Sequence, residues 1–173
     1  MPDRFGDARG FFSETWNARA LAAAGIDAAF VQDNHALNRR RGTVRGLHYQ
    51  IPPCAQGKLL RVTRGAVLDV AVDVRRGSPT FGQHAAVRLS AENWRQLWVP
   101  PGFAHGYCTL EDDSEVQYKT TDYYSLSHER GIAWDDPTLA IDWPFDVANV
   151  FVNERDRRLP WLAEQPDLFE YGA

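Results

Sequence analysis

Between residues 59 and 121 the sequence alternates strand-like and turn-like segments every few residues, and this spacing limits the fold more than any other feature. The longest apolar run, residues 66–74, is rich in β-branched side chains and is interrupted only by Asp69 and Asp73. Shorter apolar segments follow, and the turns between them leave little room for helices. Many short strands with regular turns predict an all-β sandwich or barrel.

Outside this region the sequence predicts only a few short helices at the periphery of the β fold. The strongest pattern is alanine-rich: Asn17 is a suitable cap for a helix through Ala24, and Gly25 is placed to end it in the left-handed conformation. The part of the chain that follows residue 122 is rich in Trp and Pro. It predicts irregular structure with one short helix after Leu159.

Length and composition exclude several classes of protein. With 173 residues the chain predicts a single domain over residues 1–173, and a net charge of -4 provides no basic surface for nucleic acid. Cys54 and Cys108 are too few for a disulfide framework and form no Cys-x-x-Cys pair, so we expect a reducing compartment. No apolar run approaches the roughly 18 residues of a membrane span. We expect a cytoplasmic protein that binds neither a membrane nor nucleic acid.

The segment 45–64 carries the side chains with the clearest chemistry. His48 lies on a predicted strand whose alternation places Gly46, His48 and Gln50 on one face. Lys58 opens the next strand, and a hairpin-like return would bring it close to His48. A neutral imidazole beside an ammonium suits proton abstraction next to a carbonyl, because the cation stabilises the enolate oxygen that develops. A solvated polar loop is the alternative interpretation.

A second motif, Pro-Pro-Gly-Phe-Ala-His at residues 100–105, fits the Pro-x-Gly-x-x-His motif of the cupin superfamily. Cupins normally supply His-x-His and a later Glu as metal ligands from their first motif. The corresponding stretch here is His48-Tyr49-Gln50, with one imidazole only, whereas metal sites use three or four convergent donors. The resemblance implies a cupin barrel without its metal. A metal-dependent cupin oxygenase or isomerase is the alternative.

Seven spaced blocks closely resemble the dTDP-4-dehydrorhamnose 3,5-epimerase family over nearly the whole chain, from about residue 5 to residue 162. Any one block is weak evidence, but seven in the family's order are specific. The resemblance implies a homodimeric cupin jelly roll without a metal or organic cofactor. It also implies a substrate, a dTDP-linked 4-keto-6-deoxy sugar that the enzyme inverts at carbons 3 and 5. The blocks are residues 9–14, 32–34, 45–50, 55–58, 100–105, 118–124 and 128–131.

The same resemblance assigns the catalytic roles. His48 matches the general base, Lys58 the residue that steadies the enolate, and Tyr118 the acid that reprotonates from the opposite face. A Tyr is protonated at neutral pH and can donate once the enolate forms. A base of this kind needs a carboxylate that orients its ring. Asp156 is the first choice for that carboxylate, and Asp69 on the long apolar strand is its competitor.

The remaining positions that match the family bind substrate. Tyr124 matches the aromatic residue that stacks on thymine, and Arg45 is the natural bidentate partner for a diphosphate. Arg155 stands where the family has a Lys, which keeps the charge and changes the hydrogen-bond geometry. The other matching positions are Arg9, Glu14, Gln32, Asp33, Asn34, His105 and Glu129.

Two questions stay open at this level. An enzyme that inverts only carbon 3 or only carbon 5 would carry the same residues, while a non-catalytic sugar-binding relative would require the loss of His48 or Tyr118.

Family members also carry about one more strand before the block at Phe5, and that strand helps to build the dimer's sheet. We expect its absence here to affect the dimer more than the catalytic residues.

Overall fold

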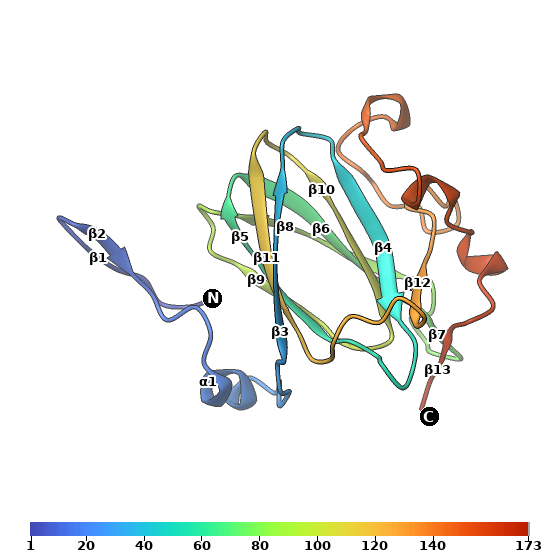
Figure 1. Ribbon diagram of the computed structural model, residues 1–173, viewed down its shortest axis with the longest axis horizontal. Helices are drawn as coiled ribbons and strands as arrows, with labels where there is room; N and C mark the ends of the chain where they lie inside the picture. Colours follow the sequence, from blue (N-terminus) through green and yellow to red (C-terminus); the bar gives the residue numbers. More distant parts are fainter. Residues whose placement is uncertain (173) are drawn as a thin grey trace.

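The computed structural model describes residues 1–172 and is built from two antiparallel sheets that face each other (Figure 1). The expected all-β sandwich is confirmed. One sheet has five strands, in the order β12 (Glu129–Gly131), β4 (Val44–Gln50), β10 (Phe103–Thr109), β6 (Ala66–Asp73) and β8 (His84–Ser90). The other has four, in the order β3 (Gln32–Asn38), β11 (Ser114–Thr120), β5 (Lys58–Arg64) and β9 (Gln96–Val99).

The remaining elements are short and peripheral. Two pairs of very short strands lie outside the main sheets: β1 (Phe5–Asp7) with β2 (Gly10–Phe12), and β7 (Arg75–Arg76) with β13 (Phe169–Glu170). The helical elements are α1 (Ala18–Ala23) and the 3-10 helices η1 (Val147–Asn149), η2 (Asp156–Arg158) and η3 (Leu162–Glu164). None of the helices within residues 1–172 is long and apolar enough to cross a bilayer.

Strand β6 explains the long apolar run, because both of its faces are buried. Val67 and Ala71 point between the two sheets and join a core with Val116 of the facing sheet. Val70 and Val72 point the other way and pack under the C-terminal segment. A strand that is covered on both sides reads as a continuous hydrophobic run rather than as an alternating one.

The C-terminal segment covers the outer face of the five-stranded sheet (Figure 1). Ile132, Leu139 and Leu162 from this segment pack on Leu47 and Val72 of the sheet. Burying such a side chain contributes about 1.5–3 kcal/mol relative to leaving it exposed. The same packing holds η2 against β4, and it thereby brings a distant part of the chain behind the strand that carries His48.

The hairpin expected between the strands of His48 and Lys58 is wrong. Strand β4 pairs with β10 and β12, whereas β5 pairs with β11 and β9 in the facing sheet. The connecting segment, residues 51–57, therefore crosses from one sheet to the other. His48 and Lys58 lie on opposite walls of the sandwich, and the expected proximity arises across the interior rather than along a turn.

Local signals predicted the peripheral helices well. The side chain of Asn17 accepts hydrogen bonds from the backbone N–H groups of Arg19 and Ala20, at 2.9 and 3.2 Å. Gly25 follows the helix with φ of +85°, a conformation that glycine adopts without steric cost. The helix expected after Leu159 is η3.

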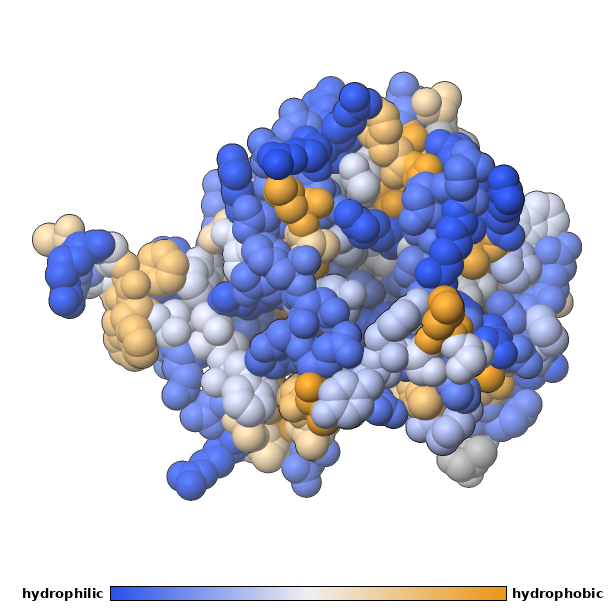
Figure 2. Space-filling view, in the orientation of Figure 1, coloured by the Kyte–Doolittle hydropathy of each residue, from blue (hydrophilic) through white to orange (hydrophobic). Residues whose placement is uncertain are grey.

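The N-terminal hairpin, β1 with β2, projects away from the two sheets (Figure 1). Phe5, Phe11 and Phe12 are 65%, 60% and 71% exposed. Figure 2 shows apolar surface on the projecting arm. The arm contacts Trp94 of the body edge-to-face through Phe11, with ring centroids 4.9 Å apart, and Arg4 lies 5.3 Å from the centroid of the same Trp94 ring.

Candidate active site

A cavity of about 340 Å³ opens between the two sheets. His48 enters it from β4 in the five-stranded sheet, while Lys58 and Tyr118 enter from β5 and β11 in the facing sheet. The three side chains are brought together because strand alternation turns all of them inward. The remaining lining residues are Gln32, Asn34, Tyr49, Gln50, Gln56, Thr120, Tyr124 and Glu129.

The carboxylate that orients His48 belongs to Asp156. Its Oδ1 lies 2.8 Å from His48 Nε2, and its Oδ2 accepts the backbone N–H of Gly46 at 3.1 Å. A carboxylate only accepts, so Nε2 carries the proton and Nδ1 remains free to take one. Burial acts to raise the pKa of Asp156, but the hydrogen bond and charge of His48 and the Gly46 amide outweigh it, and the pKa is lowered.

Asp69, the alternative carboxylate, is hydrogen-bonded to a different histidine. Its Oδ1 lies 2.9 Å from His105 Nε2, and both side chains are buried. His105 pairs directly with His48 in the register of β10 and β4, yet each imidazole has its own carboxylate. Within residues 1–172 no three His, Cys, Asp or Glu side chains converge as metal ligands would.

Lys58 spans the gap between the two walls. Its ammonium donates a hydrogen bond to the backbone carbonyl of His48 at 3.1 Å. Burial lowers the pKa of Lys58 to about 8, while the negative charges of Glu129 and Asp69 act against that shift. An ammonium has three donors, so after the bond to His48 it can still bind an oxygen in the cavity.

Tyr118 stands on the wall opposite His48. Burial raises the pKa of its phenol, Arg45 acts to lower it, and Glu129 raises it further. The phenol is therefore protonated at neutral pH and can act as a proton donor toward a group held between the sheets. Arg45 itself is anchored by a 2.7 Å hydrogen bond from its Nε to Asn38.

Tyr124 lies at the mouth of the cavity, 53% exposed. Its hydroxyl donates to Glu129 at 2.5 Å, and Arg155 contacts the same carboxylate oxygen at 2.6 Å. Its backbone N–H donates to the side-chain oxygen of Gln32 at 3.0 Å. The Gln32 amide in turn donates to Asn34, also at 3.0 Å. The expected positions at the mouth thus form one connected group.

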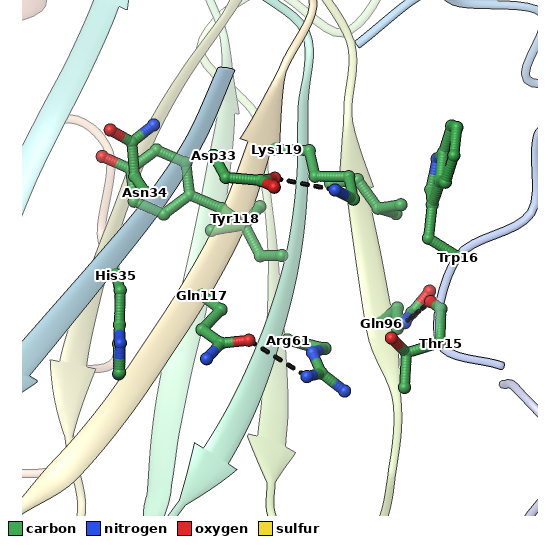
Figure 3. A pocket seen from close by; sticks show the side chains of 12 residues that line it. Thr15, Trp16, Asp33, Asn34, His35, Arg61, Gln96, Gln117, Tyr118 and Lys119 are labelled. Carbon is green, nitrogen blue, oxygen red and sulfur yellow. Dashed lines mark hydrogen bonds and ion pairs between the residues drawn. The ribbon is translucent and has the colours of Figure 1, made fainter. Parts of the chain in front are cut away.

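Of the ten expected substrate-binding residues, four line the cavity: Gln32, Asn34, Tyr124 and Glu129. Arg45, His105 and Arg155 do not line it, and the other three lie further away. Asp33 points to the outer face of its sheet and pairs with Lys119 at 2.7 Å, away from the Tyr118 ring (Figure 3). Alternation explains this, because Gln32 and Asn34 take the inward positions on either side. Arg9 is bonded to Asp7, and Glu14 accepts from Asn17 at 2.9 Å. Both belong to the N-terminal arm rather than to the cavity.

Sequence reasoning missed three polar residues of the site. Thr120 shares the inward face of β11 with Tyr118, so alternation was a sufficient signal. Gln56 lines the cavity from the connecting segment 51–57, where no periodicity exists. Asn38 is 2% exposed and holds Arg45 through a contact between two different strands, which no local pattern reveals.

Comparison with known proteins gives a consistent result. A family model described as dTDP-4-dehydrorhamnose 3,5-epimerase matches residues 1–164. The enzyme of that name from Pseudomonas aeruginosa is 57% identical over 158 residues, covering 91% of this chain and 86% of that protein.

Two solved structures are informative. A 3,5-epimerase from Legionella pneumophila in complex with dTDP-4-keto-L-rhamnose superposes with a TM-score of 0.94 at 46% identity, covering 99% of this chain and 92% of that one. A 3'-monoepimerase from Streptomyces bikiniensis in complex with dTDP-quinovose gives a TM-score of 0.87 at 36% identity, covering 94% and 81%.

The barrel, its polar cavity and these matches define an isomerase with a cupin-like fold. The chain belongs to the dTDP-4-dehydrorhamnose 3,5-epimerase family.

Proposed function

We propose that this protein epimerises dTDP-4-dehydro-6-deoxyglucose at carbons 3 and 5 and yields dTDP-4-dehydrorhamnose, in deoxysugar biosynthesis. The observation that carries the proposal is that His48 and Tyr118 line the same cavity from facing sheets, and that the Lys58 ammonium in this cavity donates to the backbone carbonyl of His48. Inversion of a carbon next to a ketone needs a base on one face of the planar intermediate and an acid on the other. Two different residue types on two different sheets meet that requirement.

In this scheme His48 Nδ1 removes the proton from the carbon beside the ketone. The electron pair of the C–H bond moves into a carbon–carbon double bond, and the carbonyl oxygen becomes an enolate oxygen. Lys58 donates to that oxygen, where a buried cation is far more effective than in water. Asp156 stabilises the imidazolium that His48 becomes, because its carboxylate lies 2.8 Å from the protonated nitrogen.

Tyr118 then donates its proton to the other face of the same carbon, and the carbon–oxygen double bond re-forms. One inversion leaves His48 as an imidazolium and Tyr118 as a phenolate. Proton exchange with solvent then returns both side chains to their neutral forms. The second centre reacts by the same steps after the sugar ring has turned to present it. Because His48 and Tyr118 approach from fixed walls, the direction of inversion is set by the fold.

We assign the nucleotide to the mouth of the cavity. Tyr124 offers an exposed ring for stacking on thymine, and its neighbours Glu129, Arg155 and Gln32 hold that ring in place. Stacking of a base on an aromatic side chain contributes about 1–3 kcal/mol. We assign the diphosphate to Arg45, which lies on the same strand as His48.

We further propose a homodimer. The exposed rings of Phe5, Phe11 and Phe12 lie on a two-stranded hairpin, a unit that is marginally stable alone and gains from a covering surface. A second copy offers that surface by symmetry. In such a dimer the arm carries Arg9 and Glu14 away from their own cavity toward that of the other copy, which reconciles their position with their expected role.

One domain over residues 1–173 would carry the whole activity, because both sheets contribute to the same cavity. We also propose a cytoplasmic location. Cys54 and Cys108 are both free thiols, as is usual in a reducing compartment.

The proposed reaction predicts a specific product. EDTA-dialysed enzyme incubated with dTDP-4-dehydro-6-deoxyglucose should give the sugar inverted at both carbons 3 and 5, at the same rate as untreated enzyme. The charge at the enolate comes from Lys58, so chelation has nothing to remove. Proton NMR of the product determines both configurations.

The same experiment separates the alternatives. Inversion at one centre only would identify a single-centre epimerase, like the Streptomyces bikiniensis relative. Loss of turnover on chelation, restored by one divalent metal, would identify a metal-dependent cupin.

The lowered pKa of Lys58 predicts a pH dependence. Lys58 must be charged to stabilise the enolate, so the rate at saturating substrate should fall as the pH rises through about 8. Tyr118 cannot cause this limb, because burial raises its pKa above the usual range. In Lys58→Arg, which stays charged, any remaining activity should not fall in this interval. A pH–rate profile in which Lys58→Arg keeps the same limb would contradict the assignment.

The dimer predicts that Arg9 acts on the other copy. Arg9→Ala and His48→Ala should each be nearly inactive alone. Co-expressed, they should form mixed dimers in which one of the two sites is intact, since it combines His48 from one chain with Arg9 from the other. Random assortment gives roughly a quarter of wild-type sites. No recovery in purified mixed dimers would show that Arg9 serves its own cavity or none.

A further inference from the structure

Gln50 lies on the cavity wall two residues beyond His48, where a direct contact with substrate would be the simplest expectation. It is 3% exposed. A buried primary amide needs partners for two donors and its acceptor, because an unpaired polar group in such a place is costly. The hydrogen-bond partners of the Gln50 amide therefore indicate its role.

All of these partners are backbone groups of the two segments that border the cavity mouth. The Gln50 Nε2 donates to the carbonyl of Cys54 at 2.6 Å and to the carbonyl of Tyr123 at 3.1 Å. Its Oε1 accepts the N–H of Ser125 at 2.8 Å. Both donors and the acceptor are thus engaged, and only one orientation of the amide satisfies the three bonds.

Two of these bonds flank Tyr124. The segment of residues 121–128 has no helix or strand of its own, and Tyr123 and Leu126 are 65% and 72% exposed. Packing therefore does little to fix it. Gln50 holds the residue before Tyr124 through its carbonyl and the residue after it through its N–H, while Gln32 holds the N–H of Tyr124 itself.

We propose that Gln50 is a positioning residue for nucleotide recognition: it fixes the 121–128 segment so that the Tyr124 ring is held ready for the base. The inference rests on the proposed stacking role of Tyr124. It assigns Gln50 no contact with the sugar, although His48 is its neighbour on the same face of β4. A ring that is held in place before binding loses less conformational freedom when the nucleotide arrives.

The test uses Gln50→Met, which keeps the length of the side chain and removes all three bonds, and Gln50→Glu, which keeps the acceptor and removes both donors. The matched control is Gln165→Met. Gln165 is also a buried amide bonded to backbone, donating to the carbonyl of Gly131 at 2.9 Å, but it lies outside the 121–128 segment.

Both Gln50 variants should weaken binding of dTDP alone by roughly tenfold, the scale of a lost base–aromatic stack. The kcat at saturating nucleotide-sugar should stay within about twofold, since the reacting groups are untouched. Amide hydrogen exchange at Tyr124 and Ser125 should accelerate, while β10 stays protected. Gln165→Met should leave dTDP affinity unchanged even where it lowers the melting temperature.

A double variant tests whether Gln50 acts on nucleotide binding through Tyr124. In a Tyr124→Ala background, where dTDP binding is already weakened, Gln50→Met should add little, because the group that it positions is gone. Additive losses, or a fall in kcat with dTDP affinity unchanged, would overturn the role of Gln50. Unchanged dTDP affinity in Tyr124→Ala alone is a different result: it would overturn the stacking assignment, and this inference with it.

Discussion

The hydrogen bond between Asp156 and His48 joins the C-terminal segment to strand β4. Asp156 is 1% exposed, and burying a carboxylate is costly unless hydrogen bonds to its oxygens offset the loss of water. His48 and the Gly46 amide supply those bonds, so the C-terminal segment closes correctly only against a correctly formed β4. The interaction that completes the fold is also the one that orients the proposed base.

The interior of the barrel shows how a β-sandwich accommodates acid–base chemistry. One part of the space between the sheets is filled by aliphatic side chains such as Val67, Leu60 and Val116. Around the cavity the inward positions become polar, and two buried carboxylates each accept a hydrogen bond from a histidine: Asp156 from His48, and Asp69 from His105. Lys58 retains donors for an oxygen. The groups available to a substrate are therefore few, and each faces a defined direction.

Much of this was predictable from the sequence, and the failures have identifiable causes. Strand alternation placed His48 with Gln50 correctly, and the long run of β6 gave the sandwich. The pairing of β4 and β5 was mispredicted, because a turn signal does not reveal whether a chain returns within one sheet or crosses to another. The family block at residues 32–34 predicts three binding residues, whereas strand alternation turns only Gln32 and Asn34 inward and leaves Asp33 paired with Lys119 on the outer face. The choice between Asp156 and Asp69 required tertiary packing, since both are acidic residues far from His48 in sequence.

The central claim is that His48 and Tyr118 act on opposite faces of one enolate, and solvent-deuterium incorporation tests it directly. In D2O, Tyr118→Phe should exchange protons at carbons 3 and 5 while the product shows little inversion, because His48 can remove and return a proton on its own face. His48→Ala should show neither exchange nor inversion, with a loss of at least about 10²-fold in rate. Full exchange in His48→Ala, or efficient inversion in Tyr118→Phe, would contradict the account.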